Sequence, residues 1–227
     1  MADTISTRLH EVRERIAAAA RRSGRRAEEV TLVVVSKTMS VSVVAEAIAA
    51  GANVLGENRV QEAHQKVTAL AGQAVWHLIG HLQSNKAKLA VELFSRIHSV
   101  DSIRLAGELE RHAAAAGKTV RCLLEVNVGD EVQKSGAAQA EVRRILEAVG
   151  RCPHLFVDGL MAIPPFLPEA EAVRPYFRRL REIRDGLERD GFSLPELSMG
   201  MSHDFEVAIE EGATLVRIGT AIFGPRG

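Results

Sequence analysis

The sequence predicts an α/β protein folded as a closed (β/α)8 barrel, with one extra helix before the first strand. About eight short apolar or β-branched runs alternate with longer helical patterns, which is typical of a parallel sheet. The length of 227 residues suits such a barrel. No linker or shift in composition divides the chain, so we expect a single domain over residues 1–227. A doubly wound open sheet is the alternative, although its GxGxxG fingerprint is absent after the first strand.

Each element is predicted from its own pattern. Apolar residues at helical spacing indicate a first helix from about Ile5, which Ser23-Gly24 ends. The β-branched run at 31–35 indicates a strand covered on both faces. Further strands are expected at residues 54–55, 76–79, 97–100, 120–126, 155–160, 197–198 and 214–218. Helices are expected at residues 43–50, 59–70, 86–93, 101–116 with Asp101 as cap, 137–149, around 176–187 and 205–210.

Composition excludes several classes of function. The 29 basic residues balance 29 acidic ones, which argues against a wide phosphate-neutralising surface for nucleic acid. No apolar stretch is long enough to cross a membrane, and the polar start Met1-Ala2-Asp3-Thr4 lacks a signal-peptide core. We therefore expect a cytoplasmic protein with no membrane partner. Cys122 and Cys152 lie far apart, and His77 and His81 lack a third ligand, so no metal site is expected.

A lysine follows the first strand directly, and the C-terminal strand ends of a barrel carry its chemistry. Lys37 comes just after the apolar run 31–35. An apolar mouth would lower the pKa of this lysine and favour the neutral amine that attacks carbonyl groups. A solvated lysine at a strand end explains the position equally well. After the second strand, Asn58 either binds a ligand or caps the next helix.

The loops after the last two strands are rich in small and hydroxyl residues. They read Ser198-Met199-Gly200-Met201-Ser202 and Arg217-Ile218-Gly219-Thr220. Small residues let backbone amides approach an anion, and barrels commonly bind phosphate at these two loops. Ordinary turns are the alternative for either loop alone. A phosphorylated aldehyde would suit both these loops and Lys37, and pyridoxal phosphate is the common cofactor of that kind.

Seven segments together resemble the pyridoxal phosphate homeostasis proteins, small relatives of the alanine racemase barrel. The resemblance runs from about Thr31 to Gly224. The segments are VVVSKT (33–38), GENRVQE (56–62), HLIGHLQSNK (77–86), KSG (134–136), GLM (159–161), SMGMS (198–202) and RIGTAIFG (217–224).

The resemblance implies a barrel of fold-type III in which Lys37 carries pyridoxal 5'-phosphate (PLP) as a Schiff base. Asn58 matches a residue near the cofactor ring, and Arg217 matches an arginine at either the ring nitrogen or the phosphate. Arg59 stands where many relatives have tyrosine, so the resemblance does not identify the surface that stacks on the cofactor ring. The residues that match the phosphate loops are Ser198, Gly200, Met201, Ser202, Gly219 and Thr220.

The resemblance further implies a PLP-binding carrier or regulator with no turnover reaction of its own. Its partners would be PLP and apo PLP-dependent enzymes, and we expect a monomer. An amino-acid racemase is the alternative, but racemisation needs a base on each face of the substrate. Racemases of this fold take a tyrosine from a second domain, whereas Tyr176 lies on a predicted helix and Gly227 ends the chain after the last strand. A barrel that merely binds a phosphorylated metabolite is a third candidate.

Overall fold

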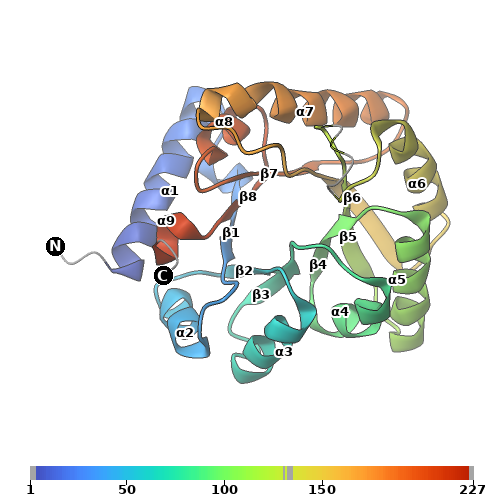
Figure 1. The fold of residues 1–227 in the computed structure, drawn as a ribbon, viewed down its shortest axis with the longest axis horizontal. Helices are drawn as coiled ribbons and strands as arrows, with labels where there is room; N and C mark the ends of the chain where they lie inside the picture. Colours follow the sequence, from blue (N-terminus) through green and yellow to red (C-terminus); the bar gives the residue numbers. More distant parts are fainter. Residues whose placement is uncertain (1–3, 130, 132–134, 225–227) are drawn as a thin grey trace.

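The computed structural model describes residues 4–129, 131 and 135–224, and it shows eight parallel strands closed into a barrel (Figure 1). The strands follow one another in chain order, and β1 pairs with β8 from Thr31 opposite Leu215 onward. This closure confirms the predicted barrel, and the open-sheet alternative is wrong. Residues 1–3 and Lys134 of the KSG segment lie outside the described residues.

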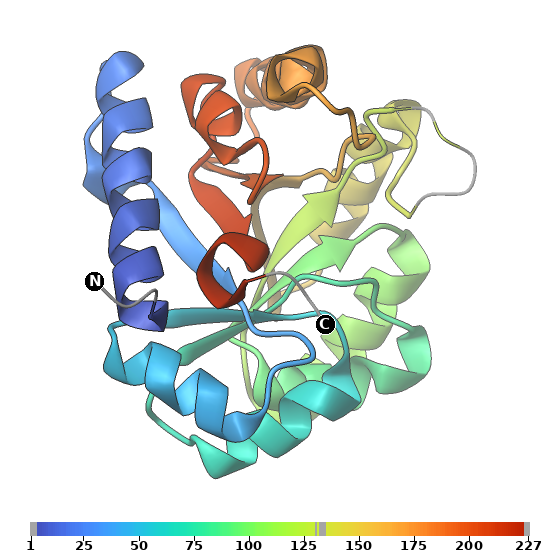
Figure 2. The same cartoon turned by 60° about the vertical axis from the view of Figure 1, so that its left-hand side comes forward.

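Helices surround the barrel on its outside (Figure 1). Helix α1 precedes the first strand as predicted, and it packs against α8 and α9 (Figure 2). The strands are β1 (Thr31–Val35), β2 (Val54–Glu57), β3 (Val75–Leu78), β4 (Arg96–Val100), β5 (Val120–Glu125), β6 (Leu155–Met161), β7 (Glu196–Met201) and β8 (Leu215–Ile218). The α-helices are α1 (Ile5–Arg22), α2 (Val41–Ala49), α3 (Val60–Ala69), α4 (Ala87–Leu93), α5 (Ile103–Ala116), α6 (Val142–Val149), α7 (Arg174–Arg189), α8 (Phe205–Glu210) and α9 (Thr220–Phe223).

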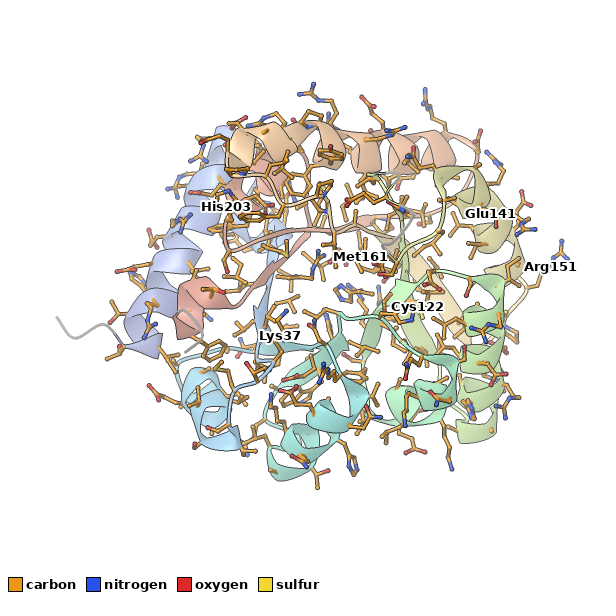
Figure 3. The ribbon with its side chains drawn as sticks, viewed as in Figure 1. Lys37, Cys122, Glu141, Arg151, Met161 and His203 are labelled. Atoms are coloured by element: carbon orange, nitrogen blue, oxygen red, sulfur yellow. The ribbon has the colours of Figure 1, made fainter. Side chains whose placement is uncertain are left out.

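The strands are apolar on both faces because each separates two packed layers. In β1, Val33 belongs to the cluster inside the barrel, and its neighbour Val34 belongs to the cluster between strands and helices. Met161, which lies near the centre of the barrel in Figure 3, belongs to the inner cluster. The alternation of side chains along each strand therefore fills both cores.

Several details differ from the prediction. The strand expected at 197–198 is longer, because β7 extends to Met201 and includes most of the segment expected to form a loop. Ser102, and not Asp101, caps α5, because its Oγ accepts a hydrogen bond from the Leu105 amide at 3.3 Å. Helix α6 begins only at Val142, after a short 3-10 turn. The four-residue helix α9 follows the last strand, and it is too short to show a period.

The described part of the chain contains neither a membrane-spanning helix nor a metal-binding group of side chains. None of the helices in this part of the chain has the length and apolar character needed to cross a bilayer. The described side chains of histidine, cysteine, aspartate and glutamate also form no group of three that could hold a metal ion.

Candidate functional site

A pocket of about 240 Å³ opens at the C-terminal ends of the strands. Its polar wall comes mainly from the segments after β1, β2, β7 and β8, and its apolar wall includes Val35, Ile79 and Phe223. This volume is below the ~300–1,000 Å³ that is usual for drug-sized ligands, so it suits a small ring compound. Of the predicted site residues, the pocket brings together Lys37, Asn58, Met201, Ser202, Arg217, Gly219 and Thr220.

Lys37 lies in a tight turn at the end of β1 (Figure 3). The Met39 amide donates to the Ser36 carbonyl at 3.1 Å and closes this turn. Thr38, the third residue of the turn, has φ = 67°. The left-handed conformation costs about 1–2 kcal/mol for a residue with a side chain, and β-branched residues rarely adopt it. The turn that presents Lys37 is therefore strained and needs support from its surroundings.

That support comes from a group of side chains that we call the Lys66 cluster: the buried Ser36, Glu57 and Lys66, and the partly exposed Glu62. Lys66 Nζ donates to the Ser36 carbonyl at 2.7 Å, to Glu57 Oε1 at 2.8 Å and to Glu62 Oε1 at 2.7 Å. Ser36 Oγ also donates to Glu57 Oε1, at 2.6 Å. Glu62 Oε1 in turn accepts the Thr38 amide at 2.5 Å. All three donors of the Lys66 ammonium are thereby used.

The two carboxylates of the Lys66 cluster have different pKa values. Burial raises the pKa of Glu57, and the hydrogen bonds from Lys66 and Ser36 offset only part of this effect. Burial would also raise the pKa of Glu62, but hydrogen bonds from Lys66 and the Thr38 amide outweigh it and lower the pKa. Glu62 is therefore a stable anionic acceptor for the strained turn.

The loops after β7 and β8 are joined by a hydroxyl group. Ser202 Oγ accepts hydrogen bonds from the Gly219 and Ala221 amides, both at 3.3 Å. The Met201 amide donates to Asp204 Oδ1 at 2.7 Å, which fixes the start of the β7 loop. Burial raises the pKa of Asp204. Small residues, backbone amides and the Ser202 hydroxyl thus lie together on one side of the pocket.

Gly200 does not lie on the wall of this pocket, although it belongs to the predicted phosphate loops. Its φ is 92°, and a Cβ there would lie 2.6 Å from the Ala208 Cβ and 2.9 Å from the Phe205 Cα. Glycine is therefore required for a left-handed turn that passes directly against α8. Gly200 shapes the loop that carries Met201 and Ser202.

Ser198 also lies away from the pocket wall and is fully buried inside the barrel. Its Oγ accepts a hydrogen bond from Arg217 Nη1 at 2.6 Å and lies 2.9 Å from His98 Nδ1. Arg217 Nη2 donates to the Ala162 carbonyl at 2.9 Å. Burial lowers the pKa of Arg217 to about 10, which leaves it charged at neutral pH. Ser198 thus holds one Nη group of Arg217 in place inside the barrel.

A chain of buried polar groups continues from Ser198 across the barrel. Because Arg217 can only donate, we assign the Ser198 hydroxyl proton to His98 Nδ1. His98 Nε2 then carries the ring proton and donates to His77 Nδ1 at 3.0 Å. Burial lowers the pKa of His77 to about 3 and holds that of His98 well below its usual value. Both rings are therefore neutral at physiological pH.

We expect nitrogen-15 NMR spectra to show both imidazoles neutral from pH 8 to pH 5. In the unfolded chain, His77 and His98 titrate near pH 6.5. Because the unfolded state takes up these protons at a higher pH than the folded state, their contribution to stability is present above pH 6.5 and is lost as the pH falls below it, down to about pH 3 for His77. Urea denaturation between pH 7.5 and pH 5 measures this loss. A resonance of either ring that titrates near pH 6.5 in the folded protein would contradict the assignment.

The mouth of the pocket carries residues that sequence reasoning missed. Phe166 follows β6 and is 76% exposed, and its ring centroid lies 5.5 Å from that of His203. Both residues line the pocket, together with Asp204. His203 follows β7 and Lys37 follows β1, and β8 lies between these two strands in the barrel (Figure 3). An aromatic residue in a proline-rich loop gave no periodic signal from which its place could be predicted.

Comparison with known proteins places the chain in a family. Residues 8–227 match the family model for the alanine racemase N-terminal domain. The chain is 48% identical over 221 residues to the pyridoxal phosphate homeostasis protein of Aquifex aeolicus, a match that covers 96% of this chain and 97% of that protein. The chain belongs to the pyridoxal phosphate homeostasis protein family. Its Escherichia coli K12 relative is 44% identical over 228 residues, covering 98% of this chain and 97% of the relative.

Solved structures agree with this membership and confirm the resemblance found in the sequence. The PipY protein of Synechococcus elongatus, with PLP bound, is 37% identical and has a TM-score of 0.86. The match covers 97% of this chain and 100% of PipY. Alanine racemase of Clostridium difficile has a TM-score of 0.78 at 14% identity, with 99% of this chain and 57% of the racemase covered. The racemase likeness shows the shared barrel fold alone.

Proposed function

We propose that this protein binds PLP in the pocket at the mouth of the barrel and acts as a carrier or regulator of the cofactor. The observation that carries the proposal is the convergence of Lys37 with the loops after β7 and β8 on one pocket of about 240 Å³. PLP is a small aromatic aldehyde with a phosphate group, and the pocket offers an amine, an apolar wall and an anion site. The PLP bound to PipY, a relative at 37% identity, supports the same ligand here.

The residues of the pocket fit the cofactor group by group. We assign the phosphate to Ser202, Gly219 and Thr220, where amides and hydroxyls meet. The apolar wall beside Val35 and Ile79 suits a ring. When bound, the cofactor supplies an aldehyde that forms a reversible C=N bond with a primary amine. Lys37 supplies that amine.

Arg217 is assigned to the ring and not to the phosphate. Its two Nη groups are held by Ser198 and the Ala162 carbonyl, whereas Ser202 lies with the Gly219 amide. A fixed cation next to the ring nitrogen would keep that nitrogen unprotonated and weaken the ring as an electron sink. Asn58, half-buried after β2, is proposed as a second polar contact to the ring.

A carrier role without turnover agrees with the placement of the only tyrosine. Racemisation needs a base on each face of the substrate α-carbon. Tyr176 lies on α7 in the outer helix layer, where it packs against the core, and it does not line the pocket. We therefore propose that the protein holds PLP and passes it to apo PLP-dependent enzymes.

The proposal is tested by comparing PLP with pyridoxal, which has the same aldehyde but no phosphate. We expect one PLP to bind per chain and the Kd for pyridoxal to be weaker by about 100-fold, because charge-assisted hydrogen bonds to the phosphate are lost. Absorbance titration of the wild-type protein measures both constants. Equal affinity for the two compounds would place the phosphate outside the loops after β7 and β8.

A further inference from the structure

The strained turn that carries Lys37 points to a role for residues that do not line the pocket. We infer that Glu62, held in place by Lys66, is a positioning residue that keeps Lys37 oriented for bond formation with the aldehyde. The inference rests on the proposed function, because it concerns the same amine. It assigns a task to the Lys66 cluster that the pocket residues alone do not explain.

The first step of the argument is the conformation of Thr38. When the third residue of a turn such as the one closed from Met39 to Ser36 takes a positive φ, glycine or asparagine usually occupies that position. Here it is threonine, with φ = 67°. The Thr38 hydroxyl donates to the Lys37 carbonyl at 2.6 Å, which is a local contact within the turn. The contact from outside the turn to the Thr38 amide is Glu62 Oε1.

The second step is the way in which Glu62 is itself held. Lys66, one helical turn later on α3, donates to the same Oε1 at 2.7 Å. The Lys66 side chain is only 5% exposed and that of Glu57 is fully buried, so this anchor does not move freely in solvent. Lys66 also donates to the Ser36 carbonyl and thereby fixes the start of the turn. One ammonium group therefore binds the first residue of the turn directly and, through Glu62, its third residue, Thr38.

The third step separates positioning from binding. Lys37 and Met39 line the pocket, but Thr38, Glu57, Glu62 and Lys66 do not. Removal of the Glu62 carboxylate should therefore leave the walls that hold a phosphorylated ring in place. It should affect the step that depends on where the Lys37 amine points.

The experiment compares covalent and non-covalent binding in Glu62→Ala. Covalent binding is measured as the rate at which borohydride fixes PLP to the protein. Non-covalent binding is measured as the Kd for 4-deoxypyridoxine 5'-phosphate, which has no aldehyde. We expect the covalent rate to fall by about tenfold, the order expected for loss of one charge-assisted hydrogen bond. We expect the Kd to change by less than about twofold, since no pocket contact is removed.

Two further variants test the cause. Glu62→Gln keeps an acceptor oxygen and should recover most of the covalent rate. Thr38→Gly in the Glu62→Ala background should also recover it, because glycine takes a positive φ without strain. The matched control is Glu46→Ala, an exposed glutamate on α2 that should behave as wild type. If Glu62→Ala does not fold by circular dichroism, Glu62→Leu, which keeps the side-chain volume, takes its place.

The outcomes distinguish this inference from the proposed function. If the wild-type protein forms no covalent bond with PLP, the proposed function fails. If wild type forms the bond and Glu62→Ala forms it equally fast, the positioning role is wrong. Two further results would show that Glu62 is merely structural and would overturn the inference. One is a loss of affinity for 4-deoxypyridoxine 5'-phosphate in Glu62→Ala as large as the fall in its covalent rate. The other is no recovery of that rate when Thr38→Gly is added.

Discussion

Lys37→Ala is expected to abolish covalent attachment of PLP completely. Borohydride converts a C=N bond between an amine and the cofactor into a stable single bond, which adds the cofactor to the protein mass. Lys37 is the lysine among the described residues that line the pocket, so its removal leaves no primary amine there. The intact mass of the reduced variant should equal that of the protein alone, whereas wild type should gain one cofactor per chain.

The matched control for this prediction is Lys88→Ala, an exposed lysine on α4 outside the pocket. It should form the same adduct as wild type. Lys37→Ala should still bind 4-deoxypyridoxine 5'-phosphate, because the proposed phosphate contacts at Ser202 and Gly219 are kept. A cofactor-sized mass increase in Lys37→Ala, at a yield similar to wild type, would show that another lysine carries PLP.

Gly200→Ala is expected to destabilise the protein and to weaken PLP binding together. The new Cβ would lie 2.6 Å from the Ala208 Cβ and 2.9 Å from the Phe205 Cα, and the residue would keep φ = 92°. Backbone and helix would have to move apart, which costs about 2–4 kcal/mol when strain and overpacking combine. Urea denaturation measures the loss of stability. Because the moved loop carries Met201 and Ser202, the Kd for PLP should rise in the same variant.

Gly107→Ala is the control for the glycine substitution. Gly107 is exposed on α5, and an added Cβ there meets no atom within 4 Å. Alanine in an exposed helix interior should stabilise the protein by about 0.5–1 kcal/mol. If Gly200→Ala were as stable as Gly107→Ala and bound PLP as tightly as wild type, the close approach of the β7 loop to α8 would have no importance for the site.

The fold and the pocket followed from local sequence patterns. The run 31–35 and the seven strand segments after it are short apolar segments between amphipathic helices. Few folds other than a parallel barrel are compatible with this alternation. The barrel then places the C-terminal ends of the strands at one mouth, which is why Lys37 and Gly219, 182 positions apart in the sequence, line the same pocket. The helix bounds shifted by a few residues where turns of 3-10 helix precede α4 and α6.

The buried polar groups could not be predicted in the same way. Glu57 at the end of β2 carried no signal of burial in the sequence, but it is fully buried and contacts Ser36 and Lys66. Only the spacing of Glu62 and Lys66, four residues apart on a helix, hinted at an ion pair. Ser198 matched a phosphate loop by sequence, yet the pleat of β7 turns its side chain into the barrel toward Arg217. Contacts between distant strands depend on register, which no single segment reveals.

The most direct test of the central claim is a crystal structure of the wild-type protein grown with PLP. We expect continuous electron density from Lys37 Nζ to the cofactor, with its phosphate among Ser202, Gly219 and Thr220. Density for PLP on a different lysine, or an empty pocket with the Lys37 side chain directed into solvent at saturating PLP, would contradict the account.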